Sequence, residues 1–118
     1  MPDLSMFVDD LEAREYAAGH VFFSAGESGD QMFIVLKGEA EITLNGKLLE
    51  TVGAGGVFGE MTLVDHHERS ADVTAKVDTT IATIDQKRFL YLIRNHPFFA
   101  IEIMKVMTER LRNFDRLL

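Results

Sequence analysis

The sequence predicts a mainly β domain, a barrel or jelly roll, with helices at both ends. Residues 20–85 break into short runs rich in β-branched and aromatic residues, and glycines separate these runs. Helical spacing of apolar residues occurs before and after this region. Several short strands at this spacing are typical of barrels and jelly rolls. The 118 residues, 47% of them hydrophobic, suffice for one core but not two, so we expect a single domain over 1–118.

The N-terminal segment, residues 1–19, is expected to be helical. Apolar residues between positions 4 and 17 follow a helical spacing and leave an acidic outer face, and Gly19 is expected to end the helix. The apolar positions are Leu4, Phe7, Val8, Leu11 and Tyr16.

Six runs within residues 20–85 are expected to be strands: HVFFS, QMFIVLKG, EAEITLNG, KLLETVG, ADVTAK and TTIATID. Asn45-Gly46 lies between two of them and is the strongest hairpin signal in the chain, because both central residues of such a tight turn need positive φ.

Residues 86–118 are expected to form two helices. Asp85 is placed to cap the first helix, and Pro97 fits the first turn of the last. A set of apolar residues in the last helix recurs at alternating steps of four and three, which indicates a homodimeric coiled-coil seam, although an ordinary helix packed on its own core is the alternative. The seam residues are Ala100, Met104, Met107, Leu111, Phe114 and Leu118, with Phe99, Ile103 and Val106 beside them facing the barrel.

Composition excludes several functions. The net charge of −7 argues against direct nucleic-acid binding, which depends on lysine and arginine, and the charges of the last helix fit the flanks of a coiled coil. Without cysteines, disulfides and thiolate chemistry are excluded, and we expect a cytoplasmic protein without a signal peptide or membrane span.

The glycine-rich turn over residues 53–56 leads into a segment with two opposite charges, Glu60 and Arg69. The turn allows a ligand to approach backbone N–H groups, and GEMTL is expected to form one helical turn. Arg69 supplies a planar fork for phosphate, Ser70 adds a hydroxyl, and Glu60 can accept a hydrogen bond from a sugar hydroxyl. A nucleotide fits this pattern. The alternative is a structural ion pair between Glu60 and Arg69.

These residues also resemble a known family. FGEMTL, residues 58–63, followed by RSA, residues 69–71, is similar to the phosphate-binding cassette of cyclic nucleotide-binding domains, and the similarity extends upstream through FSAGESGDQMFIVLKG, residues 23–38. The family implies a double-stranded β-helix, or jelly roll, over residues 20–85, with the cassette at 58–71.

The resemblance also implies site roles within residues 58–71. Arg69 would neutralise the cyclic phosphate, while Ser70 and backbone N–H groups from Gly59 to Met61 complete the cradle, and Glu60 would accept from the ribose 2′-OH. Phe58 and Ala71 belong to the same cassette. Ser70 has an alternative role toward a guanine amino group.

The base side is less defined. By the family's register Ile42 and Leu49 line the base and sugar pocket, or are plain core. Thr62 departs from the family's usual Ala or Gly and is expected either to crowd the pocket or to add a hydroxyl. Phe114 is expected to stack on the base as a lid or to belong to the seam.

Asp65-His66-His67-Glu68 is a poor metal site, because adjacent side chains on a strand point to opposite faces, so no metal is expected. No group suited to activating water for hydrolysis is visible, so we do not expect an enzyme.

The expected function is a sensor that binds cyclic nucleotide and relays binding through its last helix to an unknown effector. Family frequency favours cAMP, with cGMP open. The alternatives are a degenerate domain that only contacts proteins, or the sensor part cut from a transcription regulator, channel or kinase.

Overall fold

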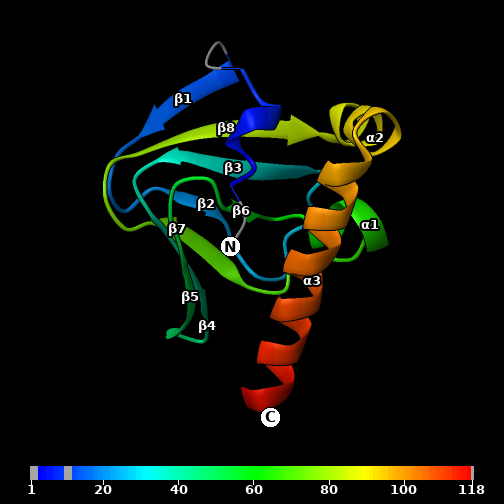
Figure 1. The fold of residues 1–118 in the computed structure, drawn as a ribbon. Coiled ribbons are helices and arrows are strands. Elements are labelled where there is room, and N and C mark those ends of the chain that lie inside the picture. Colours follow the sequence, from blue (N-terminus) through cyan, green and yellow to red (C-terminus); the bar gives the residue numbers. More distant parts are fainter. Residues whose placement is uncertain (1–2, 10–11, 118) are drawn as a thin grey trace.

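The computed structural model describes residues 3–9 and 12–117. Within this part of the chain, two antiparallel sheets enclose a core, and helices lie at one end of them (Figure 1). The elements in order are η1 (Ser5–Phe7), β1 (Ala13–Tyr16), β2 (Val21–Phe23), β3 (Gln31–Lys37), β4 (Ala40–Leu44), β5 (Lys47–Val52), β6 (Val57–Phe58), α1 (Met61–Asp65), β7 (Asp72–Ala75), β8 (Thr79–Asp85), α2 (Gln86–Asn95) and α3 (Pro97–Leu117).

The strand order confirms the predicted jelly roll. One sheet has the order β1-β8-β3-β6 and the other has the order β2-β7-β4-β5, so successive strands repeatedly cross from sheet to sheet. Two sheets connected in this way are the arrangement of jelly rolls. In Figure 1, α3 runs down one side of the sheets, away from α2.

β3 is the central strand of the fold because both of its faces are buried. Met32 and Ile34 join a cluster that includes Phe99 and Ile103 of α3, whereas Phe33 and Val35 join the cluster between the two sheets. Successive side chains of a strand point to opposite faces, so this apolar run serves both clusters at once. The barrel is thereby fixed to the helices.

The hairpin prediction is confirmed. Asn45 has φ 53° and Gly46 has φ 78°, and these two residues connect β4 and β5. Both lie in the left-handed region that a primed two-residue turn requires.

The predicted N-terminal helix is wrong. Only a single 3₁₀ turn, η1, forms near the start, and Ala13–Tyr16 form β1, which pairs with β8 from Ala13↔Ala82 to Tyr16↔Thr79. Pairing gives these residues backbone partners on a sheet edge, and this tertiary gain outweighs a weak local helical pattern. Leu11, part of that pattern, lies outside the described residues.

The two C-terminal helices are confirmed. The Asp85 side chain accepts from the Arg88 backbone N–H at 2.8 Å, and α3 begins at Pro97. The barrel-facing residues Phe99, Ile103 and Val106 are all buried, as expected. Leu118, the last residue of the proposed seam, lies outside the described residues. None of the helices formed by residues 3–9 and 12–117 is both long enough and apolar enough to cross a membrane.

Candidate nucleotide site

A pocket of about 430 Å³, part of it open to solvent, lies between the cassette, the barrel and α3. Every residue that the sequence assigned to the site lines this pocket except Leu49, which lines a smaller adjoining pocket. The predicted lining residues are Ile42, Phe58, Gly59, Glu60, Met61, Thr62, Arg69, Ser70, Ala71 and Phe114.

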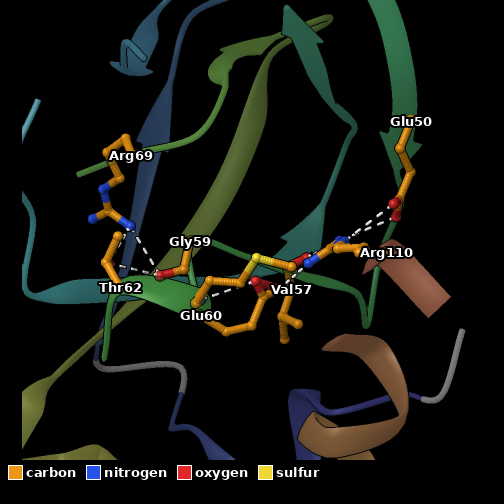
Figure 2. A network of polar contacts seen from close by, with 8 residues as sticks. Glu50, Val57, Gly59, Glu60, Thr62, Arg69 and Arg110 are labelled. Carbon is orange, nitrogen blue, oxygen red and sulfur yellow. Dashed lines mark hydrogen bonds and ion pairs between the residues drawn. The ribbon is translucent and has the colours of Figure 1, made fainter. Parts of the chain in front are cut away.

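Arg69 is held in this pocket by three segments of the protein. Its Nη1 donates to the Gly59 carbonyl and to Thr62 Oγ1, each at 2.9 Å (Figure 2), and its Nη2 donates to the Gln31 carbonyl at 2.8 Å. The guanidinium also lies 4.1 Å from the centroid of the Phe23 ring, a cation–π distance. The side chain is therefore fixed before any ligand binds.

One donor of Arg69 has no partner. The side chain is only 6% exposed, and its buried Nε has no hydrogen-bond partner. Burial lowers the pKa of the Arg69 guanidinium, and attraction to Asp30 and Glu27 opposes this effect, but arginine stays charged at neutral pH. A buried cation with an unused N–H group is suited to an anionic ligand.

Close packing around Arg69 requires a glycine at position 29. A Cβ at Gly29 would lie 2.4 Å from both Nε and Nη2 of Arg69, far inside normal contact. Gly29, Gln31 and Phe23 thus shape the anion site, although the sequence assigned them no role there. The FSAGESGDQ stretch that resembles the family, residues 23–31, was the signal that pointed to them.

Glu60 does not pair with Arg69, so the structural ion pair considered as the alternative is wrong. Glu60 instead forms an ion pair with Nη1 of Arg110, and its other carboxylate oxygen accepts from the Met61 backbone N–H at 3.2 Å. Glu60 is 2% exposed. The two charges in the cassette thus point to separate parts of the pocket (Figure 2).

Arg110 was expected to be a flanking charge of the coiled coil, and this expectation is wrong. The side chain is 7% exposed and contacts Glu60, the Val57 carbonyl at 2.6 Å and both carboxylate oxygens of Glu50 at 3.0 and 3.1 Å. A sequence signal existed. Phe99, Ile103, Val106 and Arg110 follow steps of four, three and four, which places Arg110 on the barrel-facing side of α3.

The cassette forms the predicted helical turn, α1. Gly59 has φ 79°, which glycine adopts without strain, and Glu60 is the N-cap residue of α1. Thr62 does not crowd Arg69, because its hydroxyl oxygen accepts from Nη1. Ser70 is exposed and lines the pocket, so its hydroxyl is accessible there.

The base side of the pocket is apolar. Ile42 is partly buried and packs against the barrel core, so it both belongs to the core and lines the pocket. Phe114 is half-buried and lines the main pocket as well as the adjoining one, where it meets Ile42 and Leu49. These contacts fit a planar base, and stacking by Phe114 stays a prediction.

The first part of the loop after α1, residues 66–68, does not line the pocket. His66 ends α1 in the left-handed conformation with φ 57°, and the Asp65 side chain accepts from the His67 backbone N–H at 3.0 Å. In the part of the chain that the structure describes, no group of three or more His, Cys, Asp or Glu residues is arranged to hold a metal ion.

Comparison with known proteins identifies the fold and the site together. A protein-family model for the cyclic nucleotide-binding domain matches residues 13–96, a range that contains both sheets and the cassette. The chain belongs to the cyclic nucleotide-binding domain family. The resemblance inferred from residues 58–71 is thereby confirmed.

Relatives in this family have several different architectures. The cAMP-dependent protein kinase regulatory subunit of Schizosaccharomyces pombe is 36% identical over 98 residues, which cover 82% of this chain and 23% of that protein. The cyclic AMP receptor protein of Thermus thermophilus is 30% identical over 118 residues, covering 96% of this chain and 55% of that protein. This chain therefore spans less than two thirds of the length of either relative.

A solved structure from a cyclic-GMP-dependent signalling pathway of bacterial phytopathogenesis has the same fold. It superimposes with a TM-score of 0.76 at 30% identity, and the match covers 93% of this chain and 89% of that one. The family therefore includes proteins linked to either cyclic nucleotide.

Proposed function

We propose that this domain binds a cyclic nucleotide, cAMP in the first instance, in the pocket between the cassette and α3. The observation that carries the proposal is the buried guanidinium of Arg69, which belongs to a residue that lines this pocket and has an unpartnered Nε. A cyclic phosphate supplies one negative charge and two exocyclic oxygens, and a guanidinium binds such oxygens with charge-assisted hydrogen bonds.

Glu60 is the acceptor for the ribose 2′-OH in this proposal. Its carboxylate is buried and already accepts from Arg110 and Met61, but a carboxylate has about four acceptor sites, so capacity remains for a hydroxyl. A deoxyribose ligand would leave that capacity unused, so the site is expected to prefer ribose.

The output of the domain is α3. Arg110 belongs to α3 and binds Glu60 in the cassette and Glu50 on β5, so it joins the proposed ribose site to the helix. A ligand that donates a hydrogen bond to Glu60 changes the contacts of Arg110 and so biases the position of α3. To drive that change, ligand must favour one arrangement of the helix, and a coupling of about 1–3 kcal/mol is sufficient.

Self-association through α3 is part of the same proposal. Met104 is 53% exposed and Leu111 is 58% exposed, so the outer face of α3 offers apolar surface at the predicted seam positions. Two copies that pair along this face would bury it. Phe114 lies at both the seam and the pocket, which would link ligand binding to the pairing of two copies.

Catalysis is not part of the proposed function. Hydrolysis of a cyclic phosphate needs an activated water, and the pocket's carboxylate, Glu60, is paired with Arg110. We propose a regulatory domain of an intracellular protein whose effector, a further domain or a separate protein, is moved by α3. The chain's net charge of −7 favours an effector other than nucleic acid for this part.

Calorimetric titration with cAMP, cGMP and 5′-AMP tests the proposal. We expect a cyclic nucleotide to bind at least about tenfold more tightly than 5′-AMP, because the opened monophosphate carries more charge and a different shape at the same guanidinium. If none of the three nucleotides binds, the result would favour the alternative of a degenerate domain that only contacts proteins. Tighter binding of cGMP than cAMP would assign the base.

A further inference from the structure

Thr62 stands out among the Arg69 partners because it is the only one of the three that uses a side chain. Its Oγ1 accepts from Arg69 Nη1 at 2.9 Å and lies 3.4 Å from the Gly59 carbonyl. The residue is 4% exposed. The hydroxyl is thus enclosed between the carbonyl, to which it donates, and the guanidinium, from which it accepts.

Two of the three donor nitrogens of Arg69 have hydrogen-bond partners, and the third has none. Gly59 and Thr62 together accept from Nη1, Gln31 accepts from Nη2, and Nε has no partner. Thr62 therefore accepts from an N–H group other than the unpartnered Nε–H and the second N–H of Nη2. Its hydroxyl need not be displaced when an anion binds to the guanidinium through those groups.

We propose that Thr62 is a positioning residue for phosphate binding, whose hydroxyl holds the Arg69 guanidinium in a fixed orientation beside the pocket. This inference rests on the proposed function, in which Arg69 binds the cyclic phosphate. It assigns Thr62 a role that acts through Arg69, without a contact to the ligand.

The physical basis is the entropy of a long side chain. A free arginine has many rotamers, and ordering it on binding lowers affinity. The Thr62 hydroxyl accepts from the second N–H of Nη1. Together with the Gly59 carbonyl it restricts rotation of the guanidinium group. Phe23 and Gly29 limit the space around the group but accept no hydrogen bond from Nη1. Without the hydroxyl, one buried N–H loses its partner and the guanidinium is held less firmly, by the Gly59 and Gln31 carbonyls and the Phe23 ring.

The test compares Thr62→Val and Thr62→Ala, which lack the hydroxyl, with Thr62→Ser, which keeps it. Thr108→Val is the matched control, because Thr108 lies on an exposed part of α3 and bonds the Met104 carbonyl at 2.9 Å. Titration calorimetry with cAMP and cGMP is expected to show about tenfold weaker binding for the first two variants and near-unchanged binding for the last two. Equal or tighter binding by Thr62→Val and Thr62→Ala would overturn the inference, because the hydroxyl would then compete with the ligand.

Nitrogen-15 NMR of the Arg69 guanidinium in the ligand-free protein gives a readout that does not depend on binding. Rotation of the group is expected to be slow in the wild type and Thr62→Ser, and clearly faster in Thr62→Val and Thr62→Ala. Equal rates in all four would refute the positioning role. If the wild type binds no cyclic nucleotide, the proposed function fails, while these rates still decide whether Thr62 holds Arg69.

Discussion

Arg110 on α3 forms a buried ion pair with Glu60 at the start of α1, fifty residues earlier in the chain. The same guanidinium reaches Glu50 on β5, so a single side chain connects the last helix, the cassette and the barrel. The cassette is therefore attached to α3 directly at the residue that we propose for the ribose.

The first prediction concerns the stability of this ion pair. Arg110→Met removes the cation and leaves Glu60, which is 2% exposed, as a buried carboxylate without its partner. We expect the free energy of unfolding, measured by urea denaturation, to fall by about 3–5 kcal/mol. Arg112→Met is the control on the exposed side of α3 and should change it little.

The double variant Glu60→Gln with Arg110→Met completes the test. Removing both charges avoids an unpaired buried carboxylate, so this variant should be more stable than Arg110→Met alone. If Arg110→Met and Arg112→Met have the same unfolding free energy, the buried pair has no structural role.

The second prediction concerns the planar shape of the Arg69 side chain. Arg69→Lys keeps the positive charge but cannot satisfy the acceptors Gly59, Thr62 and Gln31 and also present a further N–H to a ligand. The dissociation constant for cAMP should rise at least about tenfold in calorimetry. Arg94→Lys, on an exposed position of α2, should leave it unchanged. Full affinity in Arg69→Lys would show that charge alone is sufficient.

The third prediction uses a glycine without positive φ. At Gly29 an added Cβ would lie 2.4 Å from Nε and Nη2 of Arg69, so Gly29→Ala should displace the guanidinium and weaken cAMP binding by about tenfold. Gly53→Ala is the matched control, because nothing lies within 4 Å of its Cβ position and its φ is also not positive. Equal affinities for the two variants would mean that Arg69 can shift without loss.

The fourth prediction concerns acid conditions. Hydrogen bonds from the Ser5 hydroxyl and Ser5 backbone N–H lower the pKa of Asp3 below its ordinary value of 3.8. A carboxyl group with a lowered folded-state pKa stabilises the fold above its unfolded-state pKa, and this contribution is lost as pH falls through the folded-state pKa. An NMR titration of the Asp3 carboxyl carbon should therefore give a midpoint below that of Ser5→Ala. Equal midpoints would exclude the Ser5 hydroxyl as the cause.

The fifth prediction concerns self-association. Leu111 is 58% exposed at a seam position, so Leu111→Glu should place charge in the proposed interface and shift the protein toward monomer in sedimentation velocity. Leu48→Glu is the control, since Leu48 is 52% exposed on β5 and is not a seam position. A wild type that is monomeric with and without cAMP would contradict the seam.

The sequence predicted six of the strands, β2 to β5, β7 and β8, together with the Asn45-Gly46 hairpin and most of the residues that line the pocket, because these depend on local patterns. Alternating apolar residues, positive-φ turn residues and the cassette motif are each readable within a few positions. The N-terminal strand was missed because β1 exists only through its pairing with β8, far away in the chain. Local spacing cannot show such a partner.

Arg110 was missed for a related reason. Charged residues on a long helix usually face solvent, and only the position of α3 against the barrel buries this one between Glu50 and Glu60. The available sequence signal was the step of four residues from Val106, on the buried face of α3, to Arg110. When the buried-face spacing of a helix ends in an arginine and glutamates lie on the facing elements, the arginine is best interpreted as part of an internal ion pair.

A crystal structure of the complex with cAMP tests the central claim most directly. We predict a phosphate oxygen within hydrogen-bond distance of the Arg69 guanidinium, with the Thr62 and Gln31 contacts retained, and the ribose 2′-OH beside Glu60. A complex in which cAMP lies elsewhere and makes no contact with the Arg69 guanidinium would contradict the account.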